Sequence, residues 1–380
     1  MAGVIYLDYN ATTPVAAEVA EATASAIRGL WGNPSSSHAY GRRAAAALAR
    51  ARGQVASLLG CREDEVVFTS GGTESDNAAI VGVAEAQKGR GRHIVTSAVE
   101  HPAVGEACSY LERRGWRVSR VGVDGQGRVD PAEVEAALTD ETVLVTVMHA
   151  NNETGVLQPI REIAERTRPR GIVLHTDAAQ SVGKLPVDVG ALGVDLLALA
   201  GHKLYAPKGV GALVIRSGTP CDCFLHGAGH EAGRRSGTES TPLIVGLGAA
   251  CALAVAELEQ RSTHLRAMRD RLAGRLAEAF PDLVVHGGDA ERLPNTLYVA
   301  LPSIDANRLL QRLEGVATAA GAACHADHVE PSSVLRAMGV ADELALCTLR
   351  LTTGRETTAE EIDRAVDEIV EAARSMAGGS

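Results

Sequence analysis

Residues 172–203 read IVLHTDAAQSVGKLPVDVGALGVDLLALAGHK, and this stretch decides the fold. Two apolar runs, 172–177 and 195–200, are separated by a segment that contains glycines and a proline. Such runs are typical of strands that are buried on both faces of a parallel sheet. Asp177 closes the first run, and Lys203 follows closely after the second. The stretch therefore predicts two strands with polar, reactive side chains at their carboxyl ends.

The same alternation of strand and helix extends over the first two thirds of the chain. Apolar runs predict strands, and amphipathic segments between several of them predict helices. Strand and helix in turn imply right-handed crossovers, and therefore an α/β fold with a mostly parallel sheet and helices on both faces. The predicted strands are residues 65–69, 93–97, 117–121, 142–148, 172–177, 195–200 and 211–216, and the predicted helices are 14–30 (capped by Thr13), 73–87, 104–114, 131–138 and 160–168.

The C-terminal third departs from this alternation. A long helix over about 242–280 precedes a strand at 296–301, further helices and a glycine-rich stretch around Cys324. A chain of 380 residues is long enough for two domains. We therefore expect a large domain over residues 15–255, and a smaller α+β domain formed by residues 1–14 and 256–380.

The composition restricts the classes of function. The net charge of −10 argues against a general nucleic-acid or membrane surface. The N-terminus lacks the pattern of a signal peptide, and no apolar run approaches the roughly 20 residues of a spanning helix. Seven cysteines without framework spacing indicate reduced thiols. We expect a cytoplasmic protein without direct contact to nucleic acid or membrane.

A glycine-rich segment follows the strand predicted at 65–69. It reads Ser70-Gly71-Gly72-Thr73-Glu74-Ser75 and opens a predicted helix. Glycines let the backbone approach an anion, and a helix N-terminus offers unpaired N–H groups. Gly72 and Thr73 are therefore candidates for binding a phosphate, although the segment also fits a plain glycine turn with a capping side chain.

Asp177 and Lys203 stand at neighbouring strand ends, where ligands of an open parallel sheet collect. An aspartate can hold a pyridine nitrogen protonated, so that the ring accepts electrons, and a lysine can bind such a cofactor as a Schiff base. Their separation fits one further strand and its connection. A dehydrogenase is the weaker hypothesis, because no G-x-G-x-x-G motif follows the first strand.

Seven motifs follow one another along the chain. They are Asn10-Ala11-Thr12-Thr13-Pro14, Gly32-Asn33-Pro34-Ser35, residues 70–75, Asn151 to Gly155, His175 to Gln180, Gly201-His202-Lys203 and Arg235-Ser236-Gly237-Thr238. Together these motifs resemble those of the NifS/IscS-type cysteine desulfurases of the class-V aminotransferase superfamily, and the resemblance covers Tyr6 to about Ile369. It implies the type-I fold of pyridoxal-phosphate-dependent transferases, a homodimer, pyridoxal 5'-phosphate as cofactor, and conversion of L-cysteine to L-alanine.

The same resemblance implies a role for individual residues. Lys203 would carry the cofactor, Asp177 would pair with its pyridinium nitrogen, and His101 would stack on the ring and help to move protons. The remaining implied cofactor contacts are Asn152 and Gln180 at the ring hydroxyl, and Gly72, Thr73, His202 and, from the second subunit, Thr238 at the phosphate.

Substrate binding and sulfur transfer are implied for two residues near the C-terminus. Arg350 corresponds to the arginine that binds the substrate carboxylate, and Arg355 is a weaker candidate. Cys324 would receive the sulfur as a persulfide and pass it to an acceptor protein, such as a scaffold of iron–sulfur cluster assembly. Residues 325–328 after the cysteine, and Ala200 in place of a common serine, are more similar to selenocysteine lyase. Release of selenide and alanine therefore stays an alternative.

Two further alternatives predict different products. A plain class-V aminotransferase would form a keto acid without any need for Cys324, and a non-catalytic sulfur-relay subunit would lack a cofactor site. The presence of both Lys203 and Asp177 argues against the relay subunit. We expect no metal site at Cys221 and Cys223, because a Cys-x-Cys pair fits the usual spacing of zinc ligands poorly.

Overall fold

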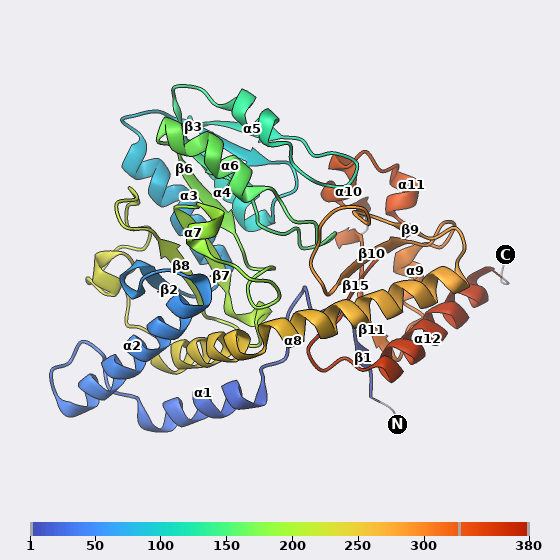
Figure 1. The fold of residues 1–380 in the computed structure, drawn as a ribbon, viewed down its shortest axis with the longest axis horizontal. Helices are drawn as coiled ribbons and strands as arrows, with labels where there is room; N and C mark the ends of the chain where they lie inside the picture. The colour runs from blue at the N-terminus through green and yellow to red at the C-terminus, as the bar shows by residue number, and fades with distance from the viewer. Residues whose placement is uncertain (1–2, 326–327, 378–380) are drawn as a thin grey trace.

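The structure is a computed structural model that describes residues 3–325 and 328–377. Its two largest sheets have seven and four strands and lie apart, with the long helix α8 (Thr241–Ala279) running along both (Figure 1). The N-terminal segment contacts both parts, because Asp8 forms a bridge with Thr352 and the Thr13 hydroxyl donates to the His202 carbonyl.

The seven-stranded sheet has the order β2-β8-β7-β6-β5-β3-β4. All pairs from β4 to β7 are parallel, whereas β8 is antiparallel to both of its neighbours. Residues 201–210 are too few for a parallel crossover, which explains the reversal of β8. The predicted mostly parallel sheet is confirmed. Its strands are β2 (Val66–Thr69), β3 (His93–Ser97), β4 (Arg117–Val121), β5 (Thr142–Thr146), β6 (Val173–Asp177), β7 (Leu196–Ala200) and β8 (Gly211–Ile215).

Helices cover both faces of this sheet, as predicted. Alternate residues of each strand contribute to different cores, so that Leu196 packs with α3 and α4 while Leu197 packs with the helices of the opposite face. Both side chains are fully buried. The helices of this part are α1 (Ala17–Gly29), α2 (Ala39–Leu59), α3 (Gly72–Gln87), α4 (Pro102–Glu112), α5 (Pro131–Ala137), α6 (Ile160–Thr167) and α7 (Val189–Leu192).

The N-terminal helices correct the sequence-based expectations in two places. The helix expected from Pro14 begins only at Ala17, because the Thr13 hydroxyl does not cap it. That hydroxyl instead donates to the His202 carbonyl at 3.0 Å and accepts from the Tyr205 amide at 2.9 Å. The 21-residue helix α2 was not among the predicted helices, although its alanines and arginines have high helix propensity.

The four-stranded sheet has the order β12-β15-β10-β9 and is antiparallel throughout. The N-terminal strand β1 (Ile5–Tyr6) pairs with β11 (Val316–Ala317), so the first residues pack with the C-terminal part. The elements here are β9 (Val284–Val285), β10 (Thr296–Ala300), α9 (Ala306–Leu310), β12 (Ala319–Ala320), β13 (Ala322–His325), β14 (His328–Pro331), α10 (Ser333–Ala337), α11 (Asp342–Ala345), β15 (Thr348–Thr352) and α12 (Ala359–Ala377).

Helix α8 contributes side chains to the cores of both parts, for example Leu247 to one and Leu272 to the other. The residue at which the large domain ends therefore stays a prediction. An 18-residue stretch of α8, with a mean hydropathy of 1.8, is apolar enough to span a membrane by length and composition, which corrects the expectation of no such run. The helix packs against α1, α2 and α12, as a core helix does.

Candidate active site

The carboxyl ends of β3, β6 and β7 bring His101, Asp177 and Lys203 to one edge of the seven-stranded sheet. Asp177 is the last residue of β6 and pairs in register with Ala198 of β7. Lys203 follows β7 in the 3-10 turn Gly201–Lys203. The charges of Asp177 and Lys203 both act on the pKa of His101, so the three groups share one electrostatic environment. The sequence placed these three residues together correctly.

Asp177 is a buried carboxyl group with a raised pKa. Its side chain lies in a residue that is only 6% exposed, and Oδ1 accepts a hydrogen bond from the Ala179 amide at 2.8 Å. Burial raises the pKa, while the Ala179 amide, His101 and Lys203 partly offset this effect. A buried carboxylate is costly unless a cation or further donors pair with it. This environment fits pairing with a protonated ring nitrogen.

Lys203 is held by carbonyl groups and not by an acid. Its Nζ donates to the backbone carbonyls of Asn10 and Ala11, the latter at 2.8 Å. Burial and the nearby charge of Arg350 lower the pKa of Lys203 to about 8. A lysine with a lowered pKa supplies the neutral amine that attacks a carbonyl group. The amine is therefore prepared for imine formation.

This pKa predicts how imine formation depends on pH. At pH 7 a lysine with a pKa of about 8 is roughly 10% neutral, whereas an ordinary lysine is about 0.03% neutral. The rate at which the apoprotein combines with pyridoxal 5'-phosphate should therefore rise up to about pH 8 and then level off. Stopped-flow absorbance measures this rate. A rate that continues to rise to pH 10 would show that the amine is not perturbed.

His101 caps the N-terminus of α4, and this role fixes its ring. Nδ1 accepts a hydrogen bond from the Ala103 amide at 3.1 Å, and Pro102 occupies the first helical turn. Burial lowers the pKa of His101, with Asp177 opposing and Lys203 adding to the shift. The imidazole is therefore oriented by the helix and favours its neutral form, with Nε2 left for other contacts.

The glycine segment at the start of α3 has the backbone geometry that an anion cradle requires. Gly71 has a φ of 153°, and α3 begins at Gly72 with free amide groups in its first turn. A Cβ atom on Gly72 would lie 3.3 Å from the Ala200 side chain, so α3 approaches the end of β7 closely. Burial lowers the pKa of His202 to about 4, and its Nδ1 contacts the Thr12 hydroxyl at 3.1 Å. These features fit a bound phosphate group.

The Arg235–Thr238 motif lies beside this cradle within the same chain. Arg235 Nε contacts Glu74 Oε1 at 2.8 Å, and Glu74 Oε2 accepts from the Ser70 amide at 2.8 Å. Thr238 itself is exposed to solvent in the single chain. Its contact with the phosphate of a second subunit stays a prediction.

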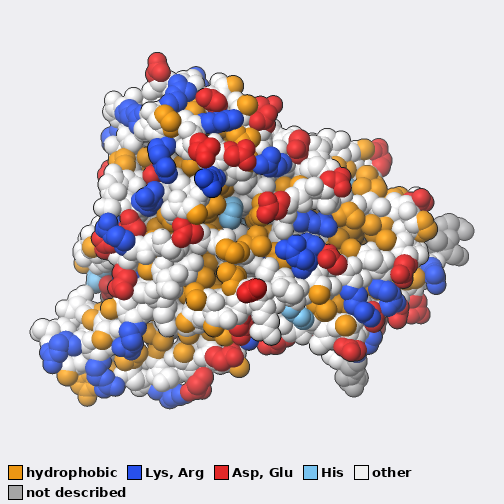
Figure 2. Space-filling model, in the orientation of Figure 1, with side chains coloured by type: hydrophobic (Ala, Val, Ile, Leu, Met, Phe, Trp, Pro, Cys, Tyr) orange, Lys and Arg blue, Asp and Glu red, His pale blue; other side chains and the backbone are white. Residues whose placement is uncertain are grey.

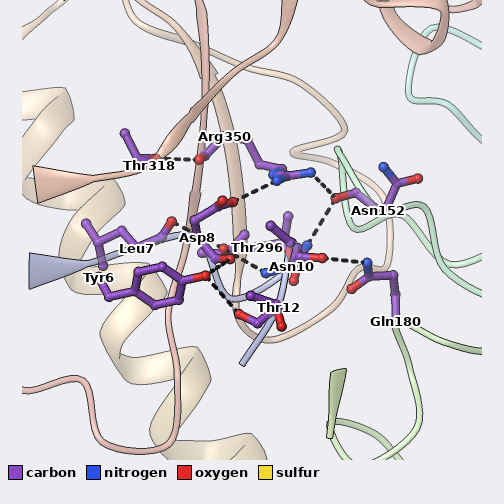
Figure 3. A network of polar contacts seen from close by, with 12 residues as sticks. Tyr6, Leu7, Asp8, Asn10, Thr12, Asn152, Gln180, Thr296, Thr318 and Arg350 are labelled. Carbon is purple, nitrogen blue, oxygen red and sulfur yellow. Dashed lines mark hydrogen bonds and ion pairs between the residues drawn. The ribbon is translucent and has the colours of Figure 1, made fainter. Parts of the chain in front are cut away.

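Asn10 connects the candidate residues Gln180 and Lys203 to the smaller sheet, a role that the sequence did not reveal (Figure 3). Its backbone carbonyl accepts from Gln180 Nε2 at 3.0 Å as well as from Lys203. Its side-chain Nδ2 donates to the Asn152 carbonyl at 3.2 Å and to Thr296 Oγ1 at 2.9 Å. Gln180 and Asn152 therefore meet at Asn10, although their predicted contacts with a ring hydroxyl stay predictions.

Lys184 is a second buried lysine that sequence reasoning missed. Its Nζ lies 3.1 Å from Asn10 Oδ1 and 3.0 Å from Gln180 Oε1. Burial lowers its pKa well below the ordinary value, and the charges of Lys203 and Arg350 add to the effect. Because Lys184 occupies Gln180 Oε1, it keeps the amide nitrogen of Gln180 directed toward Asn10.

Arg350 and Arg355, the two candidate carboxylate-binding arginines, occupy different environments. Arg350, in the centre of β15, lines a cavity of about 410 Å³ together with Glu153 and Tyr298. Arg355 instead contacts Glu257 at 3.1 Å and lies near the ring of Tyr205. Both arginines therefore pair with a protein carboxylate, since Arg350 contacts Asp8, but of the two it is Arg350 that lines this cavity.

Cys324 belongs to the hairpin of β13 and β14, where its backbone is paired with Val329. The side chains of residues 322–329 lie outside the described part, as do Ala326 and Asp327 altogether. The downstream end of the hairpin is anchored at the cavity, because Ser332 Oγ donates to Glu153 Oε2 at 2.5 Å. The position of the Cys324 thiol, and its role, therefore stay predictions.

Cys221 and Cys223 make contacts to the protein backbone. Cys221 Sγ lies 3.7 Å from the Ala78 carbonyl, and Cys223 Sγ lies 3.1 Å from the Leu225 carbonyl. Among the side chains of residues 3–321 and 330–376, no group of three or more His, Cys, Asp or Glu is arranged to hold a metal ion.

Comparison with known proteins extends these observations to the whole chain. The family model "Aminotransferase class-V" matches residues 5–365. Cysteine desulfurase IscS of Dictyoglomus turgidum is 43% identical over 365 residues, covering 96% of this chain and 93% of the relative. Cysteine desulfurase IscS of Pseudomonas aeruginosa is 45% identical over 377 residues, covering 98% and 93%.

Solved structures agree in fold and in family. A structure described as a NifS-like protein superposes with a TM-score of 0.91 at 36% identity, covering 97% of this chain and 98% of the other. A second, described as SspA in complex with cysteine, has a TM-score of 0.83 at 34% identity and covers 93% and 99%. The chain therefore belongs to the aminotransferase class-V family and, within it, to the cysteine desulfurases.

Proposed function

We propose that this protein is a pyridoxal-phosphate-dependent enzyme that converts L-cysteine to L-alanine and transfers the sulfur to Cys324 as a persulfide. The observation that carries this proposal is the pair formed by Lys203, whose pKa is lowered, and the buried carboxyl group of Asp177 at adjacent strand ends. The cysteine desulfurases that are 43–45% identical over nearly the whole chain support the same activity.

The residues of this edge would hold the cofactor in defined places. Lys203 would bind its aldehyde carbon, Asp177 its ring nitrogen, and the first turn of α3 at Gly72 and Thr73 its phosphate. His202 and Thr238 are proposed as further phosphate contacts, the latter from a second subunit. When bound, pyridoxal 5'-phosphate supplies an electron sink that stabilises negative charge on the substrate α-carbon.

The side chains of this protein would then act on the substrate. Arg350 would bind the α-carboxylate, and Lys203, once free, would remove the α-proton and return it elsewhere with the help of His101. The thiolate of Cys324 would attack the substrate sulfur. A sulfur–sulfur bond forms while the bond from sulfur to Cβ breaks, and the electron pair stays with the carbon fragment, which leaves as alanine after protonation.

The names of the relatives favour a desulfurase over a selenocysteine lyase or a plain aminotransferase. We further propose that the enzyme is a cytoplasmic homodimer that delivers sulfur to an acceptor protein. On the face drawn in Figure 2, acidic and basic side chains are interspersed, which is in keeping with a protein acceptor rather than a nucleic acid.

The test of this function needs the purified enzyme loaded with cofactor and free of added reductant. After L-cysteine is added, we expect alanine and, by mass spectrometry, a gain of one sulfur atom on the peptide that contains Cys324. Alanine without protein-bound sulfur would favour a lyase. Formation of a keto acid in place of alanine would contradict the proposal and indicate an aminotransferase.

A further inference from the structure

Asp8 and Arg350 form an ion pair between residues that are 342 positions apart in the chain. Arg350 Nη2 donates to Asp8 Oδ1 at 2.7 Å, and the two side chains point toward each other in Figure 3. The Asp8 side chain is 21% exposed and the Arg350 side chain is 14% exposed. The pair therefore lies partly open to solvent at the cavity that Arg350 lines.

The backbone holds both partners in place. Asp8 forms a parallel bridge with Thr352, and the Thr352 amide donates to the Leu7 carbonyl at 2.8 Å. Arg350 lies in the centre of β15, where it is paired with Tyr298 of the neighbouring strand. Strand pairing therefore sets the distance between the backbone at Asp8 and the backbone at Arg350. At this distance the carboxylate of Asp8 reaches the guanidinium of Arg350 directly.

The other contacts of the guanidinium are weaker. Nη1 lies 3.3 Å from the Asn152 carbonyl, and Nε is buried without a hydrogen-bond partner in the described part of the chain. A guanidinium that binds both oxygens of a carboxylate needs a fixed plane, because the two parallel N–H groups must face the two oxygens together. The short contact to Asp8 is the one that restrains this plane most strongly.

We infer that Asp8 is a positioning residue for substrate binding, because its carboxylate fixes the guanidinium plane of Arg350 and leaves further N–H groups for the substrate carboxylate. This inference rests on the proposed role of Arg350. Asp8 acts through that arginine and not on the reacting atoms. Loss of Asp8 should therefore weaken the binding of ligands that carry a carboxylate and leave the binding of other ligands unchanged.

Isothermal titration calorimetry on the cofactor-loaded enzyme tests this prediction with L-alanine and L-alanine methyl ester, which lacks the carboxylate charge. Asp8→Ala should weaken the binding of L-alanine about tenfold and change the binding of the ester less than about twofold. The Asp8→Asn variant keeps an oxygen at the same position, and its affinity for L-alanine should fall by less than about threefold. In turnover, Asp8→Ala should raise KM for L-cysteine much more than it lowers kcat.

Asp363→Ala is the matched control, because Asp363 pairs with Arg271 and Arg275 on helices away from the cavity. This substitution should leave the binding of both ligands unchanged. Equal weakening of L-alanine and its ester by Asp8→Ala would overturn the inference, as would no weakening of either. If Asp8→Ala does not fold, Asp8→Ser replaces it with the same expected results. The Arg350→Gln variant tests the proposed role of Arg350 separately from that of Asp8. Unchanged binding of L-alanine to this variant would refute the proposed role of Arg350 itself.

Discussion

Replacement of Lys203 by alanine is expected to reduce kcat/KM for L-cysteine by about 10,000-fold, the upper range for loss of a proton-transferring group. The same variant should lose the visible absorbance of the lysine-bound cofactor. Both effects have one cause, because the amine that Asn10 and Ala11 hold in place is proposed to bind the cofactor and to carry the α-proton. Alanine formation and an absorbance spectrum of the reconstituted protein measure them.

Lys88→Ala serves as the control, since Lys88 is an exposed lysine at the end of α3. It should retain both the activity and the spectrum. A Lys203→Ala protein that keeps the visible absorbance would mean that another amine binds the cofactor. Lys184 would then be the first candidate, because it is buried and its pKa is also lowered.

Replacement of Cys324 by alanine should reduce alanine formation from L-cysteine by about 1,000-fold or more, as expected when a nucleophile is removed. The steps before sulfur transfer should persist, because they depend on Lys203 and not on the thiol. Exchange of the α-proton of L-alanine with deuterium, followed by nuclear magnetic resonance, should therefore stay within about threefold of the unmodified enzyme. This combination distinguishes loss of sulfur transfer from loss of the site.

Cys347→Ala is the matched control, because Cys347 lies directly before β15 in the same part of the chain. It should form alanine at the rate of the unmodified enzyme. Measuring the turnover of selenocysteine by the same variants provides a second comparison. If the Cys324→Ala variant converts L-cysteine as fast as the unmodified enzyme, direct sulfur transfer to Cys324 is excluded and a lyase or aminotransferase becomes the better assignment.

The strand ends could be predicted because their signals are local. Asp177 and Lys203 each follow an apolar run, and parallel strands bring such ends to one edge of the sheet. Helix α2 could also have been predicted, since its composition and the left-handed Gly60 after it are ordinary signs of a helix and its end. The contacts of Thr13 could not be predicted from the sequence, because its hydroxyl bonds to groups next to Lys203 that are about 190 residues away.

The network around Asn10 could not be predicted for a similar reason. Lys184 is 174 positions from Asn10, and nothing in its neighbourhood shows that its amine will be buried between two amide oxygens. Asp8 likewise meets Arg350 only after β1 and β15 have joined the smaller part of the molecule. Long-range pairing of the chain decides these contacts, and a single sequence does not record it.

Reduction of the cofactor-loaded enzyme with borohydride, followed by peptide mapping, tests the central claim most directly. Borohydride makes the bond between the lysine and the cofactor permanent, so mass spectrometry identifies which amine was used. We expect the phosphopyridoxyl group on Lys203 and on no other lysine. Its presence on Lys184, or its absence from every peptide, would contradict the account.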